Sequence, residues 1–214
     1  MDDGVVESRA GVAVMLRLTG WRCVVVGGGG VGLRRGRWVV EAGGRLVVVA
    51  PSVLPGLKGI AERVMDRGYR EGDLAGARLV VTATDDAAVN ERAAAEAARE
   101  GALVNRADAA ERGDLTVMGG FTAGPITVGV DTGGSSAAAG KALRDRLREA
   151  VGQDWPVLLE EAKQWRKRLR STVDDAERRS RRLRRLTDEE ARRVLAEGGV
   201  EALRAHLRAV AEGG

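Results

Sequence analysis

The sequence is poor in the residue types that carry much of protein chemistry. Its 214 residues include one cysteine, one histidine and one tyrosine, and only 3 % are aromatic. A single cysteine, Cys23, allows no disulfide within the chain, which is typical of proteins from a reducing compartment. Because Cys23 lies in an apolar run, we expect a small buried side chain there rather than a nucleophile. The histidine, His206, stands far from any cysteine, so we predict no metal site.

Long apolar runs are also missing. No run reaches the roughly 18 residues that a membrane-spanning helix needs. The first residues, MDDGVVESR, are acidic, whereas a secretory signal begins with basic residues. We therefore expect a cytoplasmic protein with no membrane partner. Basic residues exceed acidic ones by only 35 to 31, so the Arg-rich run RRSRRLRRL is interpreted as a solvated helical face and we expect no nucleic-acid partner.

The first half of the chain alternates between apolar runs and helix-like stretches. The runs that predict strands are Arg22–Val26, Arg45–Ala50, Leu79–Ala83 and Leu103–Asn105. The stretches that predict helices are Val31–Ala42, Leu57–Arg67 and Ala87–Glu100. Apolar strands that lack alternation and are separated by helices indicate a parallel sheet covered on both faces. The expected fold class is therefore α/β, with a doubly wound parallel sheet over residues 1–114.

The pattern changes after residue 114. Two short β-like runs, Leu115–Val117 and Ile126–Val130, precede a helix predicted over Ala137–Ala150. We expect residues 115–151 to form a small α+β dimerisation region. Residues 152–214 are helical by pattern, because Leu158, Ala162, Trp165 and Leu169 recur at helical spacing. This gives three regions, the last of them all-helical.

The stretch VVVGGGGVG follows the first predicted strand and opens the first predicted helix. Its spacing Gly27-x-Gly29-x-x-Gly32, in that context, is the dinucleotide-binding fingerprint. Gly27 permits the tight turn, Gly29 lets a pyrophosphate approach the backbone, and Gly32 lets the helix pack on the sheet. The helix N-terminus offers free N–H groups to the phosphates. The sequence therefore predicts a Rossmann-type nucleotide-binding domain, although a loop serving only packing would also use these glycines.

The second strand ends without the carboxylate that usually holds the ribose of NAD. The residues after it are Pro51 and Ser52, and neither an acidic side chain nor an arginine stands there. Ser52 can offer a hydroxyl contact. Local chemistry therefore leaves NAD and NADP both open.

Polar residues follow the next two predicted strands, where ligands bind in such sheets. This rule places Thr84 in the cofactor crevice. Asp85 and Asp86 come next, and we expect at least one of them to cap the following helix. Asn105 and Asp108 end the fourth strand. Asp108 precedes no clear helix of its own, so it is the better candidate for a working carboxylate.

A turn rich in hydrogen-bond donors, DTGGSS, precedes the helix predicted from Ala137. Thr132, Gly133, Gly134, Ser135 and Ser136 would suit the binding of carboxylates or phosphate. An ordinary helix start, with Ser135 or Ser136 as the N-cap, explains the same residues equally well.

The order of these motifs resembles the precorrin-2 dehydrogenase / sirohydrochlorin ferrochelatase family, the amino-terminal module of siroheme synthase. The resemblance rests on VVVGGGGVG, VVVAP, DLAGARLVVTATDD with Asn90, LVNRAD, and GDLTVMGGFTAGPITVGVDTGGSS. It covers about residues 13 to 150. Arg106 and Ala107 stand where the family pattern has two valines.

The resemblance implies an NAD-dependent dehydrogenation of the tetrapyrrole precorrin-2 to sirohydrochlorin, by a homodimer. It matches Gly30 and Val31 to loop residues that contact the cofactor. It also matches Pro51 and Ser52 to cofactor contacts after the second strand. It matches Asp108 to the catalytic aspartate and Thr132–Ser136 to the substrate-side turn, and we expect Asn105 to bind the substrate as well. Two alternatives stay open: an enzyme that also inserts iron as a ferrochelatase, and a non-catalytic NAD(H)-sensing protein.

Overall fold

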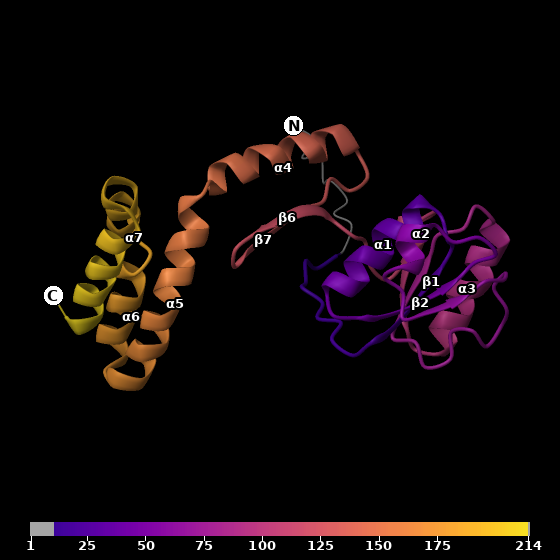
Figure 1. The fold of residues 1–214 in the computed structure, drawn as a ribbon, viewed down its shortest axis with the longest axis horizontal. Coiled ribbons are helices and arrows are strands. Elements are labelled where there is room, and N and C mark those ends of the chain that lie inside the picture. Colours follow the sequence, from indigo (N-terminus) through magenta and orange to yellow (C-terminus); the bar gives the residue numbers. More distant parts are fainter. Residues whose placement is uncertain (1–10, 214) are drawn as a thin grey trace, which may run out of the picture. The chain divides into compact units, whose positions relative to one another are not determined.

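The computed structural model describes residues 11–213. The chain divides into two compact units, and the boundary between them in the sequence falls between Val117 and Met118 (Figure 1). Each unit has its own secondary structure and its own buried residues, so each is described separately.

The first unit is built on a five-stranded parallel sheet with the strand order β3-β2-β1-β4-β5. Its strands are β1 (Arg22–Val26), β2 (Arg45–Val49), β3 (Arg63–Met65), β4 (Leu79–Thr82) and β5 (Leu103–Arg106). Its helical elements are α1 (Gly30–Glu41), α2 (Pro55–Lys58), α3 (Ala87–Arg99) and the short 3₁₀ turn η1 (Ala110–Arg112). The predicted doubly wound α/β fold is confirmed.

Successive residues of the central strand point to opposite faces of the sheet. Cys23 and Val25 of β1 belong to a buried cluster on the face that α1 covers, with Val39 of that helix. Val24 and Val26 belong to a second cluster, with Ala93 of α3. The helices lie on the two sides of the sheet in Figure 1. Burial on both faces explains why this strand shows no polar alternation.

The helix predicted over Leu57–Arg67 is wrong. The structure has the four-residue helix α2 there, capped by Gly59, and then the edge strand β3. Pro55 begins α2 because its fixed φ suits a first helical turn, and Leu57 is fully buried under α1 and β2. Arg63–Met65 pairs with Val47–Val49 in parallel register. Sheet pairing at a free edge therefore outweighs the helical spacing in this segment.

The strand predicted over Leu115–Val117 is also absent, and the segment is irregular. It is held along β5 by scattered hydrogen bonds: Asp114 N donates to Val104 O (2.9 Å) and Asn105 Nδ2 donates to Leu115 O (2.9 Å). These contacts satisfy part of the free edge of β5 without forming a ladder.

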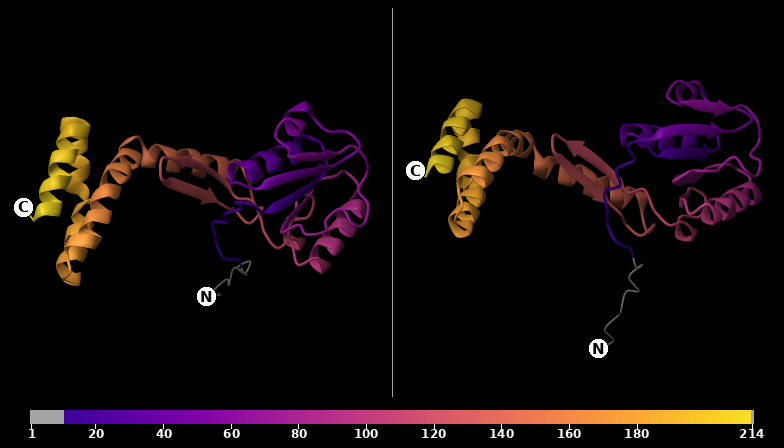
Figure 2. Two further views of the ribbon diagram at one scale, coloured as in Figure 1. Left: turned by 60° about the horizontal axis from the view of Figure 1, so that its bottom comes forward. Right: turned by 90° about the horizontal axis from the view of Figure 1, so that it is seen from below.

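The second unit begins with an antiparallel hairpin and continues as helices (Figure 2). Its elements are β6 (Gly119–Ala123), β7 (Ile126–Val130), α4 (Ala137–Val151), α5 (Asp154–Thr172), α6 (Ala176–Arg185) and α7 (Glu189–Glu212). Leu158, Trp165 and Leu169 of α5 pack with Leu203 and Leu207 of α7, as the helical spacing predicts. None of the helices within residues 11–213 is long and apolar enough to cross a membrane.

Candidate functional site

The turn between β1 and α1 requires glycine at positions where the backbone meets backbone. Gly27 has φ of 128°, and a Cβ on it would lie 2.3 Å from the carbonyl oxygen of Ala83. A Cβ on Gly32 would lie 2.3 Å from Gly27 O. These two glycines therefore close the turn and seat the start of α1 against the sheet, as their spacing predicts.

Gly28 is a site residue that the sequence reasoning missed. A Cβ on it would lie 1.9 Å from Ser52 O, and Leu54 N donates a hydrogen bond to Gly28 O (3.0 Å). The loop after β2 thus packs directly on the glycine turn, which brings the exposed Pro51 and Ser52 beside it. The signal was the unbroken run of four glycines, in which the fingerprint uses only alternate positions.

Gly29 and Gly30 serve no packing purpose within the described residues. A Cβ on either would meet nothing within 4 Å. Among residues 11–213 no side chain caps α1, whose N-cap is Gly29, and the first turn of the helix carries no acidic residue. The first N–H groups of a helix have no intrahelical partner and attract anions. An open glycine backbone at an uncapped helix start, followed by Val31, fits the pyrophosphate of a dinucleotide.

Thr84 lies at the carboxyl end of β4 and is fixed by Asn90 of α3. Thr84 N and Oγ1 both reach Asn90 Oδ1 (3.2 and 2.7 Å), and Asn90 Nδ2 donates to Thr84 O (2.9 Å). Thr84 N also lies close to where a Cβ on Gly27 would stand, at 3.1 Å. The loop after β4 is therefore tied to α3 and adjacent to the glycine turn. Asp86 caps α3 by accepting from Ala88 N and Val89 N, as predicted for one of the two aspartates.

Asp108 follows β5 and is bound by the guanidinium of Arg106. Arg106 Nε lies 3.0 Å from Asp108 Oδ1 and Nη2 lies 2.8 Å from Oδ2. This bidentate pair is the main cause that lowers the pKa of Asp108 to about 2, and the Asn90 side chain adds to the lowering through a hydrogen bond. Partial burial acts in the opposite direction. Asp108 is consequently ionised at neutral pH and 27 % exposed.

Asn105 is buried at the end of β5. Its side-chain Nδ2 donates a hydrogen bond to Leu115 O. Its Oδ1 is buried and has no hydrogen-bond partner among the described residues. The oxygen is left to accept a hydrogen bond, while the nitrogen anchors the segment that follows η1.

The predicted substrate-side turn belongs to the second unit. Ser136 is the N-cap of α4, since its Oγ accepts from Ala139 N (3.1 Å). Ser135 N donates to Thr132 O (3.0 Å), and Gly133 N donates to Asp131 Oδ1 (3.2 Å). The helix-start interpretation thus holds for Ser136. The exposed Ser135, beside Gly134, keeps its hydroxyl at the surface of this turn.

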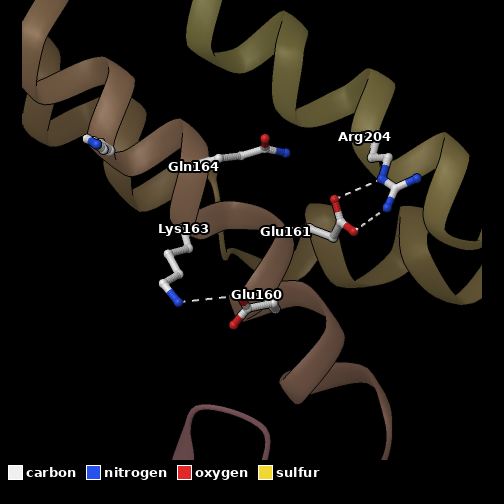
Figure 3. A pocket seen from close by; sticks show the side chains of 6 residues that line it. Glu160, Glu161, Lys163, Gln164 and Arg204 are labelled. Atoms are coloured by element: carbon white, nitrogen blue, oxygen red, sulfur yellow. Dashed lines mark hydrogen bonds and ion pairs between the residues drawn. The ribbon is translucent and has the colours of Figure 1, made fainter.

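Figure 3 shows a charged groove on the second unit, between α5 and α7. Glu161 accepts two hydrogen bonds from Arg204, at 2.9 and 2.7 Å, and Lys163 lies 3.4 Å from Glu160. Most of these charges are already paired with each other. The groove holds none of the residues predicted for the site.

Comparison with known proteins finds a family described as putative NAD(P)-binding, which matches residues 14–119. The siroheme synthase of Chromobacterium violaceum is 36 % identical over 172 residues, which are 78 % of this chain and 37 % of that protein. The siroheme synthase of Nitrosococcus oceani is 30 % identical over 208 residues, 94 % of this chain and 44 % of that protein. The chain thus spans less than half the length of these curated relatives.

A solved structure of similar length matches nearly the whole chain. It is titled SirC, precorrin-2 dehydrogenase, and superimposes with a TM-score of 0.77 at 25 % sequence identity. The match covers 94 % of this chain and 99 % of that one. The likeness therefore includes the helical region as well as the nucleotide-binding one.

Proposed function

Because the chain belongs to the precorrin-2 dehydrogenase family, we propose that it catalyses the NAD-dependent dehydrogenation of precorrin-2 to sirohydrochlorin in siroheme biosynthesis. The observation that carries the proposal is the near end-to-end match to SirC, precorrin-2 dehydrogenase, a chain of similar length. The longer siroheme synthases match over less than half their length. The activity proposed here is the dehydrogenase.

The first unit supplies the residues that would hold the cofactor. Gly27 and Gly28 shape the turn, while Gly29, Gly30 and Val31 leave room for the pyrophosphate at the start of α1. Pro51 and Ser52, in the loop that packs on Gly28, would also contact the cofactor, and the loop at Thr84 lies beside the turn. NAD, when bound there, supplies the hydride acceptor.

Asp108 is the carboxylate we assign to the chemistry. Dehydrogenation removes a hydride and a proton from the macrocycle, so the ring system passes through an electron-poor state that a nearby anion stabilises. Asp108 is ionised at neutral pH because Arg106 lowers its pKa to about 2. An ionised carboxylate can also receive the proton that leaves the ring. Asn105 Oδ1 is a further acceptor at the same strand end.

The second unit would contribute binding of the polycarboxylate substrate and self-association. Thr132–Ser136 presents donors suited to the substrate carboxylates. Residues 115–151 are proposed as the dimerisation region of a homodimer, with residues 152–214 as the helical region. Leu143 and Leu147, one turn apart on α4, are 47 % and 41 % exposed, which supports a partner surface. We place the enzyme in the cytoplasm, where its lone buried Cys23 would stay reduced.

Turnover by the purified chain tests this function directly. Anaerobic incubation with precorrin-2 and NAD should yield NADH and the spectrum of sirohydrochlorin in equal amounts. Asp108→Asn should lower kcat by about a hundredfold, because a neutral amide neither stabilises the cation nor receives the proton. Glu111→Gln, an exposed carboxylate three residues further on, should retain full activity. Absence of NADH with the wild-type chain, or full activity of Asp108→Asn, would contradict the assignment.

A further inference from the structure

A buried guanidinium lies at the end of β5. The side chain of Arg106 is 3 % exposed, and its nitrogens divide between two carboxylates. Nε and Nη2 form the bidentate pair with Asp108, while Nη1 lies 2.9 Å from Glu91 Oε2. A cation is rarely buried unless it is paired, and breaking such a pair is costly. The pairing with Asp108 is therefore a fixed part of the fold.

The surroundings of Asp108 identify Arg106 as its dominant partner. From α3, Asn90 and Glu91 face this region, and Glu91 is shared with Arg112 of η1 (2.9 Å). Glu91 has its own pKa lowered, first by the hydrogen bond from Arg106. The exposed pair between Arg112 and Glu91 is solvent-screened and contributes little. Within residues 11–213, only Arg106 contacts both oxygens of Asp108.

We propose that Arg106 is a positioning residue, which holds the Asp108 carboxylate ionised and in one orientation as the hydride leaves the macrocycle. The proposal rests on the proposed function. In that reaction the macrocycle would be oxidised by loss of a hydride to the bound NAD, and the proton that it then loses would pass to the Asp108 carboxylate and on to solvent. A carboxylate fixed before the hydride leaves requires no reorganisation as positive charge develops. Asp108 thus acts as a preset anion rather than as a group that must first lose a proton.

This pairing makes the stability of the folded chain depend on pH. Arg106 depresses the pKa of Asp108 from near 4 in an unfolded chain to about 2. The pair therefore stabilises the folded chain fully above about pH 4, and this contribution is lost as the pH falls toward 2. Arg106 should likewise move the acid limit that Asp108 sets on activity from near pH 4 to about pH 2.

A titration of Asp108 tests the hold of Arg106 without any turnover. The ¹³Cγ signal of Asp108, assigned by its loss in Asp108→Asn, should titrate near pH 2 in the wild-type chain. Arg106→Met keeps the apolar stem and removes the charge, so the midpoint should rise by about one unit or more. Arg106→Lys keeps the charge without the planar fork and should fall between the two. Arg112→Met, the matched control, should leave the midpoint unchanged.

Steady-state kinetics then test whether the pairing of Arg106 with Asp108 contributes to the reaction. Arg106→Met should lower kcat about tenfold or more while the KM for NAD stays within a factor of about two. Its kcat/KM should also gain an acid limb at higher pH than the wild type shows. Arg106→Lys should recover part of kcat, which a role in packing alone would not produce. Arg112→Met should behave as wild type.

Two results would overturn the proposal. An unchanged midpoint in Arg106→Met would show that Arg106 does not hold Asp108 ionised, and a raised midpoint with wild-type kcat would show that the hold is not used. Failure of the proposed function gives a different pattern, in which the wild-type chain makes no NADH although its Asp108 still titrates near pH 2. That pattern would overturn the catalytic role while leaving the pairing itself established.

Discussion

At the scale of single residues, adjacent glycines in the turn after β1 have separate tasks. Gly28→Ala would bring a Cβ within 1.9 Å of Ser52 O, so the loop after β2 would have to move. We expect the free energy of unfolding to fall by about 2 kcal/mol or more. A Cβ on Gly29 would meet no atom of residues 11–213 within 4 Å, so the stability of Gly29→Ala should stay near that of the wild type. The same methyl would occupy the space left for the pyrophosphate, weakening NAD binding about tenfold or more.

Thermal unfolding and calorimetric NAD titration distinguish these effects. Gly56→Ala, whose Cβ would make only ordinary contacts with Leu33 at 3.6 Å, is the control for both measurements. Equal NAD affinity in Gly29→Ala and the wild type would mean that the open backbone there is not where the phosphates bind. A stable Gly28→Ala would mean that the loop at Ser52 gives way easily.

Some of these residue roles can be predicted from the sequence, and others cannot. Gly27, Gly29 and Gly32 follow from a known spacing with a physical reason for each. Arg106 does not, because its partner Asp108 lies two residues on and its other partner Glu91 is on a helix. A charged residue at the end of a buried strand was the available signal. It predicts some ion pair but not which carboxylate completes it.

At the scale of secondary structure, elements with full helical turns or an apolar run were predictable, including the short strands β5 and β7, whereas β3 was not. β1, β2, β4, α1 and α3 coincide with predictions made from their composition. β3 has three residues, too few for a periodicity, and its pairing with β2 exists only once the sheet forms. Strand order and edge pairing are properties of the assembled sheet, so local spacing alone assigned this segment to a helix.

One buried carboxylate on α3 holds the connection between β3 and β4. Glu96 accepts hydrogen bonds from Tyr69 Oη, Gly72 N and Leu74 N, the last two at 3.1 and 3.0 Å. Glu96→Gln would turn an NH₂ group toward donors, leaving a buried N–H unsatisfied. We expect a loss of about 2 kcal/mol in the free energy of unfolding by urea.

Glu100→Gln, one turn further along α3, is the matched control for that substitution. Glu100 is exposed and accepts a single hydrogen bond from Gly76 N (3.2 Å), so its replacement should change stability by less than about 0.5 kcal/mol. Similar losses in the two variants would show that the three-donor arrangement around Glu96 adds nothing beyond a surface contact.

At the scale of the whole molecule, the first unit contains a complete core of its own. Both buried clusters of its sheet draw their members from residues 16–115. The glycine turn, Thr84, Arg106 and Asp108 all lie within it. Binding of the substrate carboxylates and self-association are instead assigned to elements of the second unit, which has a separate helical cluster. The two proposed tasks, holding NAD and taking up the tetrapyrrole, should therefore be separable by cutting the chain between the units.

A fragment of residues 1–117 tests this separation. It should fold cooperatively, elute as a monomer and bind NAD with an affinity within a few-fold of the full chain, because its core and glycine turn are complete. It should form no NADH from precorrin-2, since it lacks Thr132–Ser136.

Size-exclusion chromatography with light scattering should show the full chain as a dimer, and Leu143→Ser with Leu147→Ser should shift it to monomer, as polar side chains weaken an apolar interface. A fragment that dimerises, or a double variant that stays dimeric, would place the self-association surface away from α4. Turnover by the fragment would instead mean that the first unit takes up precorrin-2 without help from the hairpin and helices that follow it.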